Sequence, residues 1–412
     1  MGKKARLVRK KEISKGILLT DRQRLNWLRL LRSENIGAVS FRSLIDHYKT
    51  AENALAALPE LSRKGGLSTS IRITTIEEAE KEMQEAERLG IRFIGVGEPD
   101  YPTFLKVTEA SPPLIAIKGN VSIFQKPSVG IVGSRNASAA GKKLAAQFTH
   151  FLGDAGFTTI SGLARGIDSI VHQASLLTGT VAVMAGGIDH IYPPENKKLY
   201  EDIIANGGAI ISEMPLAWKP RAIDFPRRNR IIAGLSLGLL VVEAALRSGS
   251  LITARQAAEM GRLIFAIPGS PLDPRSVGTN NLIKDGAQLT THPSDIIEML
   301  TPLIVPPPNS QLNFFEEEET VSLQFEKDNF STPHEKYDNP SCFGDDKERA
   351  TVLSALSTTP IDLDTLSTHS GVALPNLYLL LVELELAGKL TRHAGGYVSL
   401  SSLDLPQEPQ HY

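Results

Sequence analysis

Short apolar segments alternate with helix-like segments between residues 128 and 270, and this alternation constrains the fold more than any other feature. Strands with one face in water alternate apolar and polar residues, whereas these segments are apolar almost throughout. Such strands, separated by helices, are typical of a parallel sheet covered by helices on both faces. The sequence therefore predicts an α/β domain, with strands beginning near residues 128, 157, 180, 209, 237 and 263.

Smaller modules flank this domain. Helical periodicity over 20–65, and a helix over 75–89 with a capping box from Thr75 to Glu78, predict a helical module on the N-terminal side. Three short helices, the last over Leu374–Leu386, and a hairpin predict a winged helix near the other end. The expected organisation is a basic tail (1–18), a helical module (19–92), a Rossmann-like domain with a mainly parallel sheet (93–302), a linker (303–345), a winged-helix domain (346–402) and a tail (403–412).

The composition excludes several classes of protein. Cys342 is the single cysteine among 412 residues, so neither a disulfide framework nor a multi-cysteine metal site is possible. The nine histidines have no metal-ligand spacing, and no apolar run is long enough to span a membrane. We therefore expect a cytoplasmic protein with no metal, no cofactor and no membrane contact. The net charge is −2, so any nucleic-acid binding must use local basic patches; the lysines and arginines of residues 3–11 form either a solvated tail or a DNA-contacting arm.

Charged motifs follow several of the expected strands. The first strand runs into Gly133, Ser134 and Arg135, which match neither a dinucleotide-binding glycine motif nor a P-loop. Small residues there allow a phosphate to approach the backbone, and the next helix would offer free N–H groups. Ligands of such sheets bind at the carboxyl ends of the strands, so this edge is expected to form a polyanion site. Five arginines are expected in loops at this edge: Arg135, Arg165, Arg227, Arg228 and Arg230.

These motifs, in this order, resemble the DprA/Smf family of DNA-processing proteins of natural transformation. The resemblance covers about 95–300 and is most specific in the strings Ser161–Asp168 and Phe225–Asn229. It implies a SAM-like fold for the N-terminal helical module, binding of single-stranded DNA, a homodimer, and delivery of DNA to a RecA-type recombinase. It does not imply an enzyme.

The resemblance also implies roles for individual residues. Gly133, Ser134 and Arg135 would hold a backbone phosphate. Arg227 and Arg228 would contact phosphate or stack on a base, and Asn229 would position the loop. The remaining candidate DNA-binding residues have alternative structural roles. Phe225 either packs on a base or anchors its loop, and Arg165 and Arg230 either contact DNA or form buried pairs with Asp168 or Glu243.

Two other functions are possible. One is a nucleotide-processing hydrolase on a related fold, but the PGGxGTxxE string of such enzymes is missing from residues 248–259. The other is a pure adaptor, which gathered arginines disfavour, because guanidinium groups repel one another without an anion. His172 is expected to be a packing residue, and Ser236 lies in a Gly-x-Ser-x-Gly string whose helix and strand are in the wrong order for a nucleophile.

The winged helix and the dimer face are less constrained. The helix expected to read DNA carries Glu383 and Glu385 and no Lys or Arg, which favours protein contact or packing over duplex reading. A dimer face near Leu282, Ile283 and Ile296 is one interpretation of their apolar character, and contact within the chain is the other.

Overall fold

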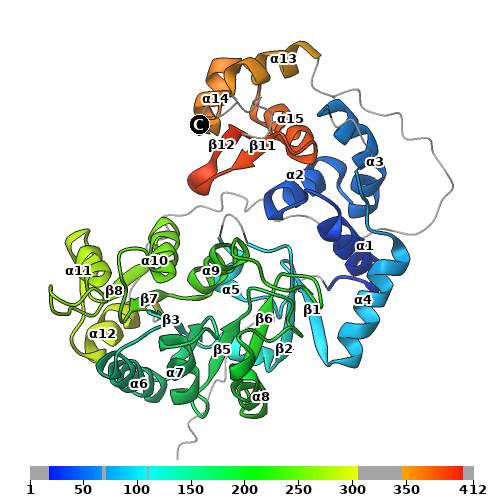
Figure 1. Ribbon diagram of the computed structural model, residues 1–412. Helices are drawn as coiled ribbons and strands as arrows, with labels where there is room; N and C mark the ends of the chain where they lie inside the picture. Colours follow the sequence, from blue (N-terminus) through cyan, green and yellow to red (C-terminus); the bar gives the residue numbers. More distant parts are fainter. Residues whose placement is uncertain (1–17, 67–70, 109–110, 305–345, 402–412) are drawn as a thin grey trace, which may run out of the picture.

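The computed structural model describes residues 18–66, 71–108, 111–304 and 346–401. It places a helical module and a winged helix together above one end of a large α/β domain (Figure 1). The expected basic tail apart from Leu18, most of the expected linker, Cys342 and the expected C-terminal tail lie outside these ranges. No helix in the described ranges is long and apolar enough to cross a membrane. The same ranges contain no group of three or more metal-ligating side chains.

The N-terminal module begins with three helices that enclose a small apolar core. Buried side chains include Trp27, Phe41 and Leu58, one from each helix. A fourth helix continues to the first strand, and its capping box between Thr75 and Glu78 confirms the prediction. The helices are α1 (Asp21–Arg32), α2 (Ala38–Tyr48), α3 (Ala51–Lys64) and α4 (Ile76–Arg88).

A nine-stranded sheet with the order β1-β2-β6-β5-β4-β3-β7-β8-β9 forms the centre of the α/β domain. The strands from β6 to β9 in this order are parallel, which confirms the predicted fold class. β1 and β2 were not predicted; they pair antiparallel with each other, and β2 pairs antiparallel with β6. The strands are β1 (Ile91–Gly95), β2 (Leu114–Gly119), β3 (Ser128–Val132), β4 (Thr158–Ser161), β5 (Thr180–Val183), β6 (Ala209–Ser212), β7 (Gly238–Val241), β8 (Leu263–Ala266) and β9 (Gln288–Leu289).

Helices cover both faces of this sheet. On one face, α9 (Asp224–Leu235) and α10 (Gly249–Glu259) pack with the short α5 (Thr103–Lys106). The other face carries four helices: α6 (Ala139–Asp154), α7 (Ile167–Ala174), α8 (Lys197–Ala205) and α12 (Pro293–Ile304). α11 (Val277–Lys284) packs beside β8. Ile296 of α12 is fully buried in the core of this chain, so it cannot be part of a dimer face.

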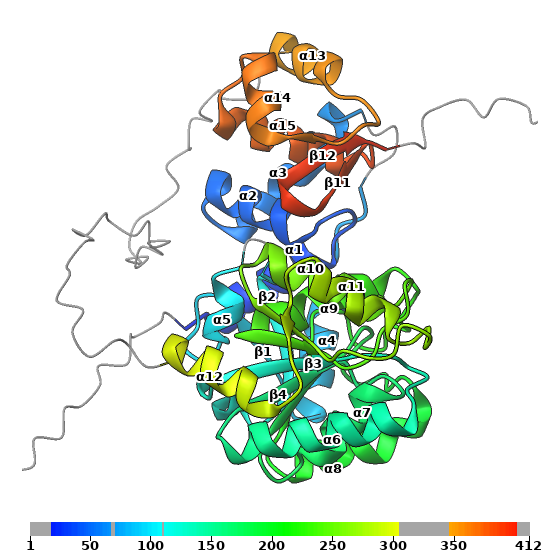
Figure 2. The same cartoon turned by 90° about the vertical axis from the view of Figure 1, so that its left-hand side faces the viewer.

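The winged helix comprises α13 (Asp346–Ala355), α14 (Leu363–Ser370), α15 (Leu374–Leu386) and the strands β10 (Ile361–Asp362), β11 (Leu390–Arg392) and β12 (Tyr397–Leu400). The bounds of α15 and the β11–β12 hairpin agree with the prediction. The domain has a core of its own, and α15 also packs against α2 and α3 (Figure 2).

Candidate nucleic-acid interface

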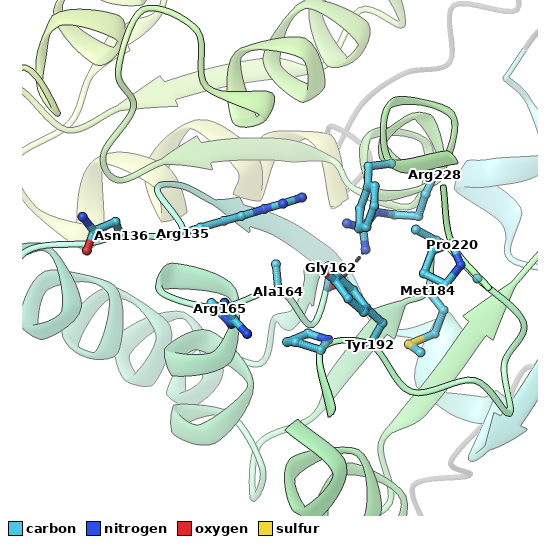
Figure 3. A pocket seen from close by; sticks show the side chains of 13 residues that line it. Arg135, Asn136, Gly162, Ala164, Arg165, Met184, Tyr192, Pro220 and Arg228 are labelled. Carbon is cyan, nitrogen blue, oxygen red and sulfur yellow. Dashed lines mark hydrogen bonds between the residues drawn. The ribbon is translucent and has the colours of Figure 1, made fainter. Parts of the chain in front are cut away.

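A cavity of about 360 Å³ opens at the carboxyl ends of β4 and β5 (Figure 3). A second hollow of about 500 Å³ adjoins it and extends to the start of α10. The two share Arg135, Asn136, Ala164, Phe225 and Arg228. They lie where a parallel sheet of this kind binds its ligands.

The first cavity has apolar and aromatic walls. Met184, Pro193 and Pro220 contribute to its lining, and the Tyr192 and Phe225 rings meet edge to face with centroids 5.8 Å apart. Such a surface can accept one face of a flat aromatic group such as a nucleobase.

Arg135 lies at the boundary of the two hollows. Its guanidinium carbon is 4.9 Å from the centroid of the Phe225 ring, and the side chain is exposed. Among the described residues, no carboxylate lies within ion-pair distance of Arg135 or of Arg247, which lines the second hollow. Both guanidinium groups can therefore bind an anion without first breaking an ion pair.

Arg228 has a different environment. It lies on α9, is 5% exposed, and donates through Nη1 to the Gly162 carbonyl at 2.6 Å and to the Val183 carbonyl. Because Gly162 follows β4 and Val183 ends β5, Arg228 fixes the ends of two neighbouring strands. Burial lowers the pKa of Arg228 to about 10, so the side chain remains protonated at neutral pH.

The other three arginines form ion pairs. Glu213, which follows β6, pairs with both Arg227 and Arg230, and Arg165 pairs with Glu195 on the surface. The expectation that Arg165 and Arg230 pair with Asp168 or Glu243 is therefore wrong. Repulsion among the five arginines was the argument against an adaptor, and it is weaker than expected because carboxylates neutralise the charges of three of them.

Asp168 and His172 organise the turn after β4. The Asp168 carboxylate accepts the N–H groups of Gly162 at 3.2 Å and Ala164 at 3.3 Å, and burial raises its pKa. His172 is fully buried; its Nε2 accepts the Leu163 N–H, and its Nδ1 lies 2.7 Å from Thr180 Oγ1. The predicted packing role of His172 is confirmed.

The turn after β3 is close-packed. Gly133 has no room for a side chain, because a Cβ there would lie 2.7 Å from Ile167 Cγ1. Ser134 Oγ accepts the N–H of Asn136 at 3.1 Å. The expectation of free N–H groups at the start of α6 is wrong in part: Glu243 accepts the N–H of Ser138 at 2.9 Å, so a carboxylate already occupies that position.

The segment Phe225–Arg227 was expected in a loop, but α9 begins at Asp224 and carries Phe225, Arg227, Arg228 and Arg230 on its first two turns. Asn229, 8% exposed, lies in the same helix and joins it to α10, because its Nδ2 donates to the Gly249 carbonyl at 3.3 Å.

Several residues of the site were missed by sequence reasoning. Met184, Tyr192, Pro193 and Pro220 line the cavity, and Glu213 anchors two arginines. Each follows one of the expected strands, so position after a strand was the available signal.

Family models and known proteins match most of this chain. Residues 92–301 match the family model described as DNA recombination-mediator protein A, residues 21–85 match a DprA-like N-terminal HHH domain, and residues 338–396 match a DprA winged helix domain. Protein Smf of Escherichia coli is 39% identical over 73% of this chain and 75% of its own length. Protein Smf of Synechocystis is 31% identical over 92% of this chain and 98% of its own.

A solved structure is also similar. The match to DNA processing protein A of Streptococcus pneumoniae covers 68% of this chain and 98% of the other chain, with 31% identity and a TM-score of 0.56. The chain belongs to the DNA recombination-mediator protein A family, the DprA/Smf family that its motifs resemble.

Proposed function

We propose that the chain binds single-stranded DNA at the carboxyl edge of its sheet. The observation that carries this proposal is the exposed guanidinium group of Arg135 above Phe225, at the mouth of an apolar cavity. A phosphate on Arg135 and a base against Phe225 and Tyr192 would satisfy both features. Gly133 and Ser134 would support the phosphate, and Arg165, Arg228 and Asn229 contribute to the lining of the two hollows. Arg227 and Arg230 lie on the same helix as Arg228 but line neither hollow, so they would act through their pairs with Glu213.

The shape of the cavity favours single strands over duplex. A base enters a cavity of about 360 Å³ only when it is neither paired nor stacked. In a duplex, unpairing and unstacking a base costs on the order of a few kcal/mol. A single strand avoids this cost, so it should bind more tightly.

Family membership supports a wider role. The chain would deliver single-stranded DNA to a RecA-type recombinase in the cytoplasm, as a homodimer, during DNA uptake and recombination. The domain boundaries 19–92, 93–302 and 346–402 are part of the same proposal.

The lining of the two hollows supports binding without catalysis. Among the described residues that line them, Asp168 is the single carboxylate, and it is buried and accepts two backbone N–H groups. A hydrolase needs a general acid or base that can reach its substrate. Release of a free base from a nucleoside monophosphate would revive the hydrolase alternative.

Fluorescence anisotropy of labelled oligonucleotides over a salt series tests the proposal. Arg135→Ala removes one charged phosphate contact, so we expect single-strand affinity to fall by about tenfold or more. The plot of log affinity against log salt concentration should become less steep by about 0.7. Arg22→Ala is the matched control, because Arg22 is an exposed arginine that pairs with Glu52 on the N-terminal module. Equal binding by wild type and Arg135→Ala would place the DNA site elsewhere.

A further inference from the structure

Helix α15 has little surface in water beyond its first turn, where Leu374 and Pro375 are exposed. From Leu377 to Leu386 each residue is buried except Tyr378 and Glu385. A helix that is buried all round packs against other elements on more than one side. In a winged helix that reads duplex DNA, by contrast, one face of this helix lies free to enter the major groove.

The apolar side chains of α15 form two stripes. One stripe belongs to the core of the winged helix: Leu377, Leu380, Leu381 and Leu384. The other enters the apolar cluster of the N-terminal module, which contains Trp27 and Phe41: Leu379, Val382 and Leu386. One helix thus completes two cores from opposite ends of the chain (Figure 2).

Close polar contacts accompany the second stripe. Asn35 Nδ2 donates to the Leu386 carbonyl at 3.1 Å. At the end of α3, a Cβ on Gly65 would overlap the carbonyl oxygen of Glu383 and lie 2.6 Å from its carbon. The backbones are therefore close enough there that only glycine fits.

The charges of α15 are unsuited to DNA. The helix has no Lys or Arg, and its two carboxylates are used within the winged helix, Glu383 with Arg349 at 2.8 Å and Glu385 with Arg392 at 2.9 Å. Neither the exposed surface nor the charge of α15 offers what a base edge or a phosphate requires.

We propose that α15 is a docking helix: the N-terminal helical module of the same chain occupies, in solution, the face through which a winged helix reads duplex DNA. The two end modules then unfold as one unit, and α15 takes no part in binding duplex. This proposal does not depend on the single-strand site.

Unfolding of the full chain in urea tests the docking. Trp27 and Trp218 are the two tryptophans of the sequence, so in a Trp218→Phe background the fluorescence reports the shared cluster through Trp27. Gly65→Ala adds one methyl group at the contact, and Val382→Glu places a charge in the second stripe. Tyr378→Glu is the matched control, because Tyr378 lies on the same helix and is 38% exposed.

Docking predicts a lower urea midpoint for Gly65→Ala and for Val382→Glu and no shift for Tyr378→Glu. The loss of stability in the double variant Gly65→Ala/Val382→Glu should not exceed the sum of the losses in the two single variants, because both changes break the same contact. Gly65 has φ −65°, which alanine adopts freely, so an undocked module would be unaffected or stabilised by Gly65→Ala. An unchanged or higher midpoint in Gly65→Ala would therefore overturn the proposal.

Two further readouts separate the alternatives. A midpoint that rises with protein concentration would mean that α15 docks on a second copy, which contradicts docking within the chain. Duplex affinity should be the same in wild type and in Tyr378→Glu. A tenfold weaker duplex affinity in that variant would show that α15 contacts DNA, and the proposal would fail.

Discussion

At the scale of single residues, Arg135 and Arg228 line the same cavity but have different roles. Arg135 is exposed above Phe225, whereas Arg228 is buried and donates to two backbone carbonyls. A substitution of Arg135 should change DNA binding with little effect on stability. A substitution of Arg228 should first change stability, because the acceptors it satisfies belong to the buried residues Gly162 and Val183.

We expect Arg228→Lys to lower the free energy of unfolding by about 1–3 kcal/mol, although the charge is kept. An ammonium group at the end of a different stem cannot reproduce the bonds of the guanidinium to the ends of β4 and β5, and an unsatisfied buried acceptor costs about this much. Chemical denaturation of the two proteins measures the difference. A loss of DNA affinity with unchanged stability would contradict this structural role.

The buried His172 gives the stability of the fold a pH dependence. Burial lowers the pKa of His172 to about 3, whereas the unfolded chain has the ordinary value of 6.5. Below pH 6.5 the unfolded state therefore binds a proton that the folded state refuses, and stability falls by about 1.4 kcal/mol per pH unit toward pH 3.

Denaturation at several pH values should show a shallower fall in His172→Gln than in wild type. The raised pKa of the Asp168 carboxyl acts in the opposite direction, because its folded state holds a proton longer than the unfolded state. That contribution is common to both proteins and cancels in the difference. Parallel curves for the two proteins would show that His172 is not the responsible group.

The sequence located the arginines but not their partners. Arg165 pairs with a carboxylate 30 residues away, and Arg227 pairs with one 14 residues away. Both carboxylates follow other strands, so the pairs depend on how the sheet brings strand ends together. Position after a strand indicated Arg135, Arg165 and Arg228, which line the hollows, but also Arg227 and Arg230, which do not. The three-dimensional structure was needed to show which guanidinium groups have no carboxylate partner among the described residues.

At the scale of elements, the segment between β6 and α9 is fastened to the N-terminal module. Arg32 of α1 donates to the Glu213 carbonyl at 3.3 Å, and Glu82 of α4 accepts the Leu216 N–H at 3.2 Å. Arg32 and Glu82 also pair with each other at 2.9 Å. The same segment carries Pro220 of the cavity wall, so two helices of the N-terminal module help to position the site.

Glu82→Gln should loosen this segment. We expect faster amide hydrogen exchange over 213–224, a stability loss of about 1–3 kcal/mol from the broken charged contacts, and weaker binding of single strands. Glu85→Gln is the control, because Glu85 lies on the same helix and forms an exposed pair with Arg88. Equal exchange in both variants would mean that the pair does not hold the segment.

Two errors in the predicted elements have local causes. Phe225–Arg227 was expected in a loop that follows a strand, but it lies in the first turn of α9. Pro226 is tolerated there because the N–H groups of a first turn have no partner within the helix. β1 and β2 were missed because they precede the regular alternation of strands and helices, and β1 contains the exposed Arg92.

At the scale of the whole molecule, the ends of the chain form a joint unit above the sheet (Figure 1). Both modules were predictable from local periodicity, but their association was not. Nothing in the sequence of α15 says which elements cover its second apolar stripe. Glu383 and Glu385, together with the absence of Lys and Arg from α15, were sufficient to disfavour binding of duplex DNA by this helix. The structure adds that the N-terminal module covers the second stripe.

The association of α15 with the N-terminal module has a consequence for biosynthesis. Asn35 and Leu386, which share a hydrogen bond, are separated by 351 residues. At roughly 5–20 residues per second, the ribosome adds the later residue about 20–70 seconds after the earlier one. The first helices to leave the ribosome therefore wait that long with an uncovered apolar surface, and a chain released before its last helix would keep that surface exposed.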